Sequence, residues 1–140
     1  MQRDIINILK DYGLKATPQR VTILSAIQKQ GHANVDEIYK EAKEKHSTMS
    51  LATVYKNVTA LVEINLLKEL ALNNFKSKYE INTKPHSHLI CKNCGAVEDV
   101  DLTNELKSDA SKLGENRDFL IEDIEVNIYG ICSKCQNSNG

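Results

Sequence analysis

A chain of 140 residues can bury one modest core or two small ones, because folding becomes marginal at roughly 40 to 60 residues per core. The net charge is −1 and aromatic residues make up 5% of the chain, so neither extreme charge nor a large aromatic core defines its class. The charge is unevenly distributed. Up to Asn82, twelve Lys and Arg face nine Asp and Glu, a net +3; from Thr83 onward the count is six against ten, a net −4. The basic first part is therefore the better candidate for contact with nucleic-acid phosphates.

The first thirteen residues, MQRDIINILKDYG, combine an acidic fourth residue with an interrupted apolar pattern, which is typical of neither a signal peptide nor a membrane span. We therefore expect a cytoplasmic protein with no membrane partner. Thiols stay reduced in that compartment, so four cysteines in two CxxC pairs indicate a metal site before they indicate disulfides.

Four helices are predicted in the first part of the chain. The first has an apolar stripe from Ile5 to Tyr12 and stops at Gly13. Each of the other three begins at an N-cap residue, and their caps are Thr17 (followed by Pro18), Asn34 (with Glu37 completing a capping box) and Ser50. The apolar repeats that follow continue to Gly31, toward His46 and to Val62.

A hairpin is predicted next, with strands over 66–72 and 77–81 on either side of an Asn73-Asn74 turn. Helices followed by a β-hairpin describe a winged helix-turn-helix. Residues 1–82 are therefore predicted to form a winged-helix DNA-binding domain.

Residues 83–140 are predicted to form a second, α/β domain. Extended segments are expected over 86–90 and 96–102, a helix over 104–113, a last strand over 119–131 and a disordered polar tail over 136–140. The fold class is thus α+β, with a winged helix-turn-helix followed by an α/β half that carries the cysteines.

The fourth helix carries a second stripe opposite its apolar face, formed by Ala52, Tyr55, Lys56 and Thr59. In a major groove, Tyr55 can meet a thymine methyl group and Lys56 a phosphate or guanine, while the amides after Ser50 can hold a phosphate. An ordinary solvated helix face is the alternative interpretation. The candidate DNA-binding residues are Lys15, Arg20, Ser50, Thr53, Tyr55 and Lys56.

The two CxxC pairs are Cys91 with Cys94 and Cys132 with Cys135. Two residues between thiolates allow one tight turn to direct both sulfurs at one ion, so two such turns complete a tetrahedral four-thiolate site. This pattern predicts a structural Zn²⁺ that pins the last strand to the sheet. A redox motif or disulfides are the alternatives, but no thioredoxin-like βαβ start precedes either pair.

A second metal site is indicated by His86 and His88, because side chains two apart on a strand point the same way. Further nitrogen and oxygen ligands could come from His32, Glu80 and Asp99, and such a mixed set suits Fe²⁺, Mn²⁺ or Zn²⁺. Taken singly, such residues are more often a surface or capping histidine and two solvated carboxylates. His46 is predicted to be a surface residue at a helix end.

With these features in place, the chain to Cys135 resembles the ferric uptake regulator (Fur) superfamily. The resemblance is carried by five segments: GLKATPQR at 13–20, GHANVDEIY at 31–39, SLATVYKN at 50–57, HSHLICKNCG at 86–95 and IYGICSKC at 128–135. It implies a homodimer of winged-helix domains joined to C-terminal dimerisation domains, binding double-stranded operator DNA. It also implies a regulatory Fe²⁺ or Mn²⁺ site at His32, Glu80, His86, His88 and Asp99, and the structural zinc on the four cysteines.

The Asp at position 99 is similar to the residue that the peroxide-responsive branch of that superfamily (PerR) carries there. Glu80, by contrast, stands where that branch often has Asp. The resemblance therefore implies a repressor that is not an enzyme, senses hydrogen peroxide through iron-catalysed oxidation of His32 or His86, and takes no other small molecule. An iron-homeostasis repressor is the alternative. A mononuclear non-haem iron enzyme and a zinc-ribbon interaction module are more remote ones.

Overall fold

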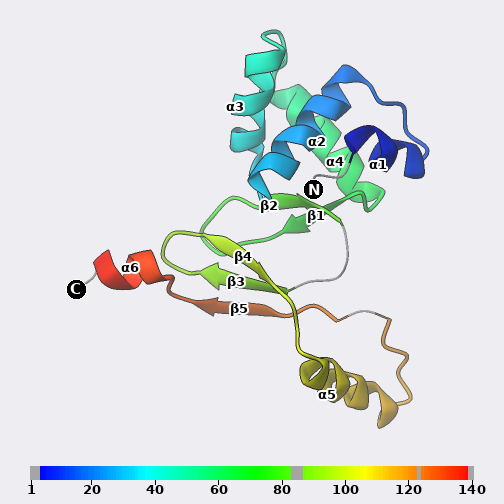
Figure 1. The fold of residues 1–140 in the computed structure, drawn as a ribbon, viewed down its shortest axis with the longest axis vertical. Helices are drawn as coiled ribbons and strands as arrows, with labels where there is room; N and C mark the ends of the chain where they lie inside the picture. The colour runs from blue at the N-terminus through cyan, green and yellow to red at the C-terminus, as the bar shows by residue number, and fades with distance from the viewer. Residues whose placement is uncertain (1–3, 83–86, 123, 139–140) are drawn as a thin grey trace. The chain divides into compact units, whose positions relative to one another are not determined.

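The computed structural model describes residues 4–82, 87–122 and 124–138. The chain divides into two compact units, unit 1 (Met1–Asn82) and unit 2 (Thr83–Gly140). Helices dominate the first unit and a three-stranded sheet the second, so the predicted α+β class is confirmed (Figure 1). Within the described residues, no helix is both long enough and apolar enough to cross a membrane.

The helices of unit 1 are α1 (Ile5–Asp11), α2 (Pro18–Gln30), α3 (Val35–Lys45) and α4 (Leu51–Glu63). The three predicted caps are confirmed, because the side chains of Thr17, Asn34 and Ser50 each accept a hydrogen bond from a backbone N–H of the first turn. Each cap satisfies an N–H group that has no partner within its helix. The starting points of these helices are thus fixed by local chemistry.

The wing of unit 1 is an antiparallel hairpin of β1 (Leu67–Leu70) and β2 (Lys78–Ile81). Two residues before α3, Ala33 adds an isolated antiparallel bridge to Tyr79 at the free edge of β2. The helices and the hairpin close over one apolar core, whose fully buried members include Leu9, Ile23, Leu24, Ile27, Ile38, Val54 and Leu66. Each such aliphatic side chain contributes about 1.5–3 kcal/mol by leaving water.

Unit 2 is built on β3 (Ser87–Cys91), which lies between antiparallel β4 (Val97–Val100) and parallel β5 (Asn127–Gly130). The crossover from β4 to β5 contains α5 (Asn104–Glu115), and α6 (Ser133–Ser138) follows the sheet. Among the described residues of this unit, few apolar side chains are buried, and they include Ile90, Cys91 and Cys135. Such a small core makes a stabilising metal ion physically reasonable.

Two predictions for unit 2 are wrong in extent. The last strand covers only Asn127–Gly130 of the predicted 119–131, because the chain first turns back over α5, where the Phe119 N–H donates to the Gly114 carbonyl at 3.0 Å. A side chain at Gly114 would meet that segment, since an added Cβ would lie 2.5 Å from the Phe119 carbonyl oxygen. The predicted disordered tail instead continues α6 through Ser138, and residues 139–140 lie outside the described part.

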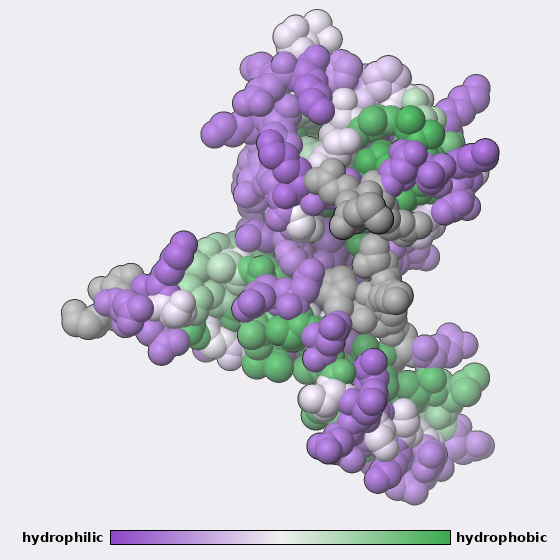
Figure 2. Space-filling model, in the orientation of Figure 1, coloured by the Kyte–Doolittle hydropathy of each residue, from purple (hydrophilic) through white to green (hydrophobic). Residues whose placement is uncertain are grey.

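The sheet of unit 2 also exposes apolar side chains, which Figure 2 shows as an apolar surface along the strands. Its members are Leu89 on β3, Ile128 and Tyr129 on β5, and Ile131 just after β5, with exposed fractions of 38 to 50%. Leu89 and Ile128 are register partners and lie on the same face of the sheet. Exposed apolar surface of this kind is typical of a region that contacts another molecule.

Candidate metal centres

The first CxxC pair is placed by the end of β3. Cys91 is the last residue of that strand, and Gly95, with a φ of 78°, lets the chain turn so that its N–H donates to the Cys91 carbonyl at 2.9 Å. This left-handed conformation carries no steric cost for glycine. The turn brings Cys94 back beside Cys91. The second pair lies at the start of α6, where the Gln136 N–H donates to the Cys132 carbonyl at 3.0 Å.

The two pairs meet in one cluster. The Cys91 and Cys135 sulfurs are 3.8 Å apart, as are those of Cys94 and Cys132, and all four sulfurs lie within 4.8 Å of one another. Four sulfurs held about 2.3 Å from one tetrahedral zinc would be separated by about 3.8 Å. These separations are far longer than a disulfide bond of about 2.05 Å. The arrangement therefore fits Zn²⁺, and four thiolates would leave it no open coordination position.

The thiolate form of Cys91 is stabilised by its surroundings. The backbone N–H groups of Cys132 and Cys94 donate to its sulfur at 3.4 and 3.5 Å, and they lower the pKa of this thiol to about 6. The thiolate is the form that binds zinc. The turn geometry thus prepares Cys91 for metal at neutral pH.

A histidine and a carboxylate meet at the edge of the wing in unit 1. His32 Nε2 lies 2.8 Å from Glu80 Oε2, and the two side chains are 10% and 4% exposed. A buried imidazole nitrogen and a buried carboxylate oxygen brought this close are the donor atoms that a divalent cation of the first transition row accepts.

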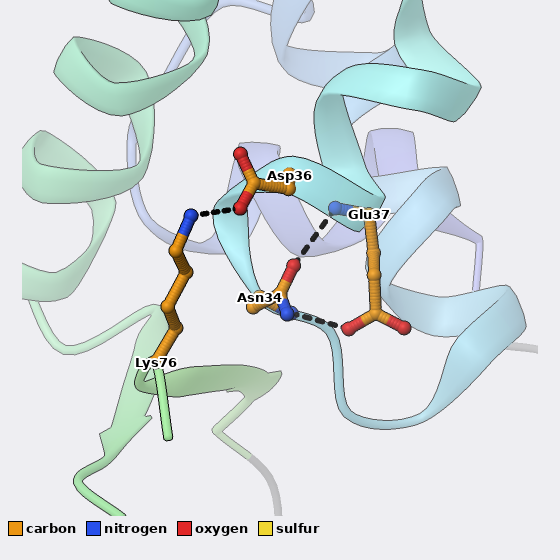
Figure 3. Close-up of polar contacts among 4 residues, drawn as sticks. All are labelled: Asn34, Asp36, Glu37 and Lys76. Carbon is orange, nitrogen blue, oxygen red and sulfur yellow. Dashed lines mark hydrogen bonds and ion pairs between the residues drawn. The ribbon is translucent and has the colours of Figure 1, made fainter. Parts of the chain in front are cut away.

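The loop that carries His32 leads into α3, whose first turn carries a capping box and makes an ion pair with the hairpin (Figure 3). Asn34 caps α3 through a reciprocal box with Glu37, with distances of 2.8 Å from the Glu37 nitrogen to Asn34 Oδ1 and 3.0 Å from the Asn34 nitrogen to Glu37 Oε1. The Lys76 ammonium group, from the turn between β1 and β2, pairs with Asp36 in the first turn of α3. The Ala33 bridge and the ion pair between Lys76 and Asp36 thereby tie the entry of α3 to the hairpin.

A second histidine and carboxylate pair lies on the sheet of unit 2. His88 on β3 is opposite Asp99 on β4 in the antiparallel register, and His88 Nε2 lies 3.4 Å from Asp99 Oδ1. The His88 ring is fully buried, whereas the Asp99 side chain is 50% exposed. The other ring nitrogen, Nδ1, lies 3.1 Å from Asn127 Oδ1 on β5. Asn127 was not singled out from the sequence, because one polar residue in an extended segment gives no distinctive pattern.

The remaining predicted ligand, His86, lies outside the described residues. His32 with Glu80 belongs to unit 1, and His88 with Asp99 belongs to unit 2. His46, for which no site was predicted, caps the end of α3 and is half-buried, with its Nε2 2.9 Å from Thr22 Oγ1.

The predicted DNA-binding residues lie on two parts of unit 1. On α4, the Tyr55 side chain is 59% exposed and Lys56 is exposed next to it, whereas Thr53 is half-buried and bonds through its N–H and hydroxyl to Ser50 Oγ. At the start of α2, the Arg20 guanidinium donates to the Lys15 carbonyl at 3.0 Å. This contact places Lys15 and Arg20 side by side, with Lys15 exposed.

Comparison with known proteins gives a consistent assignment. The model of the Ferric uptake regulator family matches residues 11–129. The chain is 33% identical over 131 residues to the peroxide-responsive repressor PerR of Staphylococcus aureus, a match that covers 92% of this chain and 87% of that protein.

Solved structures agree with this similarity. The crystal structure of the Campylobacter jejuni peroxide stress regulator matches with a TM-score of 0.76 at 36% identity, covering 95% of this chain and all of that one. The Vibrio cholerae ferric uptake regulator matches with a TM-score of 0.78 at 26% identity, covering 92% of this chain and all of that one. The Helicobacter pylori ferric uptake regulator shares the fold, with a TM-score of 0.84 at 22% identity over 99% of this chain and 98% of that one.

Proposed function

This chain belongs to the ferric uptake regulator family of metal-dependent transcriptional regulators, which are not enzymes, and we propose that it is a cytoplasmic, homodimeric repressor that senses hydrogen peroxide. One observation carries the sensing part: each unit offers a histidine nitrogen beside a carboxylate oxygen, His32 with Glu80 and His88 with Asp99. Identities of 33% and 36% to two peroxide-responsive regulators support the same branch.

The proposed regulatory ion is one Fe²⁺ or Mn²⁺ per chain, held by both pairs together with His86. Mixed nitrogen and oxygen ligands suit these ions, whereas the four thiolates suit zinc. An ion that takes ligands from both units would restrict how they move relative to each other. Shifting a two-state balance from mostly open to mostly closed requires about 5 kcal/mol of preference for the closed state. That preference would come from ligands that reach the ion only in the DNA-binding arrangement.

The peroxide response depends on which residues surround the ion. An Fe²⁺ ion held by these residues would supply the one-electron reduction that cleaves hydrogen peroxide to hydroxide and a hydroxyl radical. Addition of that radical to the imidazole ring of His32 or His86, followed by loss of one electron to a second equivalent of peroxide and of one proton to water, would leave one added oxygen on the ring and a poorer ligand. Loss of that ligand would remove the preference for the closed arrangement and release the operator.

The proposed DNA interface is the exposed stripe of α4. The half-exposed ring of Tyr55 would meet base edges in the major groove and Lys56 a phosphate or guanine, while Lys15 and Arg20 would hold the backbone or minor groove. The net charge of +3 on unit 1 favours this side of the chain for the polyanion.

The proposed homodimer uses the apolar surface of unit 2. β5 is an edge strand of the sheet, and the exposed Ile128 and Tyr129 lie on it. An exposed edge strand with apolar side chains is prone to pair with another chain. A second copy would cover that edge.

Operator binding tests the proposal directly. The zinc-loaded chain is titrated onto operator DNA with Fe²⁺, Mn²⁺ or chelator, each with and without hydrogen peroxide, and the protein is then digested with trypsin for mass measurement. His32 falls in the peptide 30–40, whereas His86 and His88 share the peptide 79–92, because trypsin does not cleave between Lys84 and Pro85. Fragmentation of that second peptide separates its two histidines.

We expect binding with either metal, and release by peroxide only in the Fe²⁺ sample, with one oxygen added to His32 or His86. Mn²⁺ serves as the matched control because it would bind the same ligands without this reaction. Binding that depends on metal but ignores peroxide would instead support the iron-homeostasis repressor. DNA binding that depends on neither metal nor peroxide would indicate a zinc-stabilised DNA-binding protein without a sensor.

A further inference from the structure

Asn127 contacts His88, the buried histidine of unit 2, at the ring nitrogen that is not beside the Asp99 carboxylate. Its Oδ1 lies 3.1 Å from His88 Nδ1, while His88 Nε2 lies 3.4 Å from Asp99 Oδ1. The His88 ring is fully buried and Asn127 is half-buried. Both ring nitrogens of His88 therefore have a polar neighbour on a different strand.

The position of Asn127 is fixed by the backbone of two strands. In the parallel pairing of β3 and β5, Asn127 is the register partner of His88. Just before it, the Val126 N–H donates to Ser87 Oγ at 3.1 Å, and the His88 N–H donates to the Val126 carbonyl at 3.1 Å. Asparagine is disfavoured in strands, so strand propensity does not account for this residue. Its contact with the imidazole gives it a physical role.

A neutral imidazole has one N–H group and one lone pair, and only the nitrogen with the lone pair can bind a metal ion. A side-chain oxygen at Nδ1 accepts the N–H bond and leaves the lone pair on Nε2, the nitrogen beside Asp99. An amide oxygen does this without adding charge to a buried ring. The contact thus selects both the tautomer and the orientation of the ring.

We propose that Asn127 is a positioning residue of the regulatory site: it holds the Nδ1–H of His88 and thereby presents Nε2 to the metal ion. The inference rests on the proposed function, because it assigns His88 as a ligand. It adds that metal affinity is set partly by β5, a strand that contributes no ligand to that ion. β5 ends at Gly130, two residues before Cys132, so the strand that carries Asn127 also leads into the cysteine cluster.

Mn²⁺ affinity of three variants tests this role, measured by isothermal titration calorimetry on the zinc-loaded full chain. Asn127→Leu keeps a side chain branched at Cγ but removes the acceptor oxygen, and Mn²⁺ affinity should fall about 10- to 100-fold, as for loss of other outer-sphere partners. Asn127→Asp keeps an acceptor oxygen of the same size and should bind within a few-fold of the unmodified chain.

Ser87→Ala is the matched control. It removes the neighbouring tie between β3 and β5 without touching the imidazole, so it should change Mn²⁺ affinity much less than Asn127→Leu does. Equal losses in Ser87→Ala and Asn127→Leu would show that strand docking alone matters and would overturn the proposal. So would unchanged affinity in Asn127→Leu.

The tautomer itself is read by long-range ¹H–¹⁵N NMR of the zinc-loaded chain without Mn²⁺, above the usual histidine pKa of about 6.5. We expect His88 to carry its proton on Nδ1 in the unmodified chain, and to lose this preference in Asn127→Leu. A proton on Nε2 in the unmodified chain would overturn the inference. If the unmodified chain bound no Mn²⁺ at all, the proposed function would fail, and the NMR result would still decide what Asn127 does.

Discussion

Ala33 and Tyr79 exchange two backbone hydrogen bonds, at 3.1 Å from the Ala33 nitrogen and 2.8 Å from the Tyr79 nitrogen. Because this bridge is antiparallel, the residues on either side of it, His32 and Glu80, are brought opposite each other. A main-chain contact thus assembles two side chains that are 48 positions apart in the sequence. The wing of unit 1 is therefore also the support of a candidate metal half-site.

Replacing His32 should remove metal control of DNA binding. In His32→Ala, the Mn²⁺ concentration needed for operator binding should rise by at least about 10- to 100-fold. Loss of a residue that only supports a metal ligand already costs that much in metal affinity. His46→Ala is the control, because His46 is also half-buried in unit 1 but bonds to Thr22. Fluorescence anisotropy of labelled operator DNA measures both variants. Equal shifts in the two variants would contradict a ligand role for His32.

The capping box at Asn34 should stabilise unit 1 more than the neighbouring surface ion pair does. Asn34→Ala removes the acceptor for the Glu37 N–H, so the free energy of unfolding should fall by about 1 kcal/mol. Lys76→Ala removes an exposed ion pair with Asp36, which is worth about 0–1 kcal/mol. Urea unfolding followed by circular dichroism compares the two, with Asn34→Asp as the variant that should retain the cap.

Tyr55 and Lys56 should affect DNA binding in different ways. Tyr55→Ala should weaken operator binding by about 1–3 kcal/mol and reduce discrimination against altered operators, because a base contact is lost. Lys56→Ala should lower affinity for all sequences and, if it contacts phosphate, reduce the salt dependence by about one charge. Lys40→Ala, an exposed lysine on α3, is the control for net charge. Loss of affinity in Lys40→Ala equal to that in Lys56→Ala would argue against a specific contact on α4.

A charge on β5 should dissociate the proposed dimer. Ile128 is 47% exposed on this edge strand, so Ile128→Glu would place a carboxylate in an apolar interface. Sedimentation velocity should then show monomers where the unmodified chain sediments as a dimer. Ile6→Glu is the control, since Ile6 is 54% exposed on α1 of unit 1. A dimer that survives Ile128→Glu would exclude this edge as the interface.

Zinc retention should depend on Cys94, the exposed cysteine of the cluster. Cys94→Ser removes one of four thiolates, so a chelator should extract zinc at lower concentration and the melting temperature of the variant should fall. Ser133→Ala, an exposed neighbour of Cys132, should leave both values unchanged. Zinc release followed with a colorimetric chelator, together with thermal melts, gives the comparison. Full zinc retention in Cys94→Ser would show that three thiolates suffice.

Local chemistry made much of the fold predictable. Thr17, Asn34 and Ser50 begin their helices as predicted, because an N-cap acts on N–H groups only two or three residues away. The cysteine cluster was predictable for a similar reason, since each CxxC turn sets its own sulfur geometry. The last strand was overestimated because apolar residues between 119 and 126 have the composition of a strand, while only four residues align with β3. Their course is decided by contacts with α5.

The sequence by itself determined the helix starts, the hairpin and the two CxxC turns, because these follow from residue types at short spacings. The assignment of the remaining candidate ligands to one site came from the family resemblance. Tertiary structure decided which ligand meets which: the Ala33 bridge pairs His32 with Glu80, and the β3–β4 register pairs His88 with Asp99. Only the tertiary structure places the Asn127 oxygen next to His88 Nδ1. Backbone pairing between distant strands sets these distances to within ångströms, and spacing along the chain carries no information about that register.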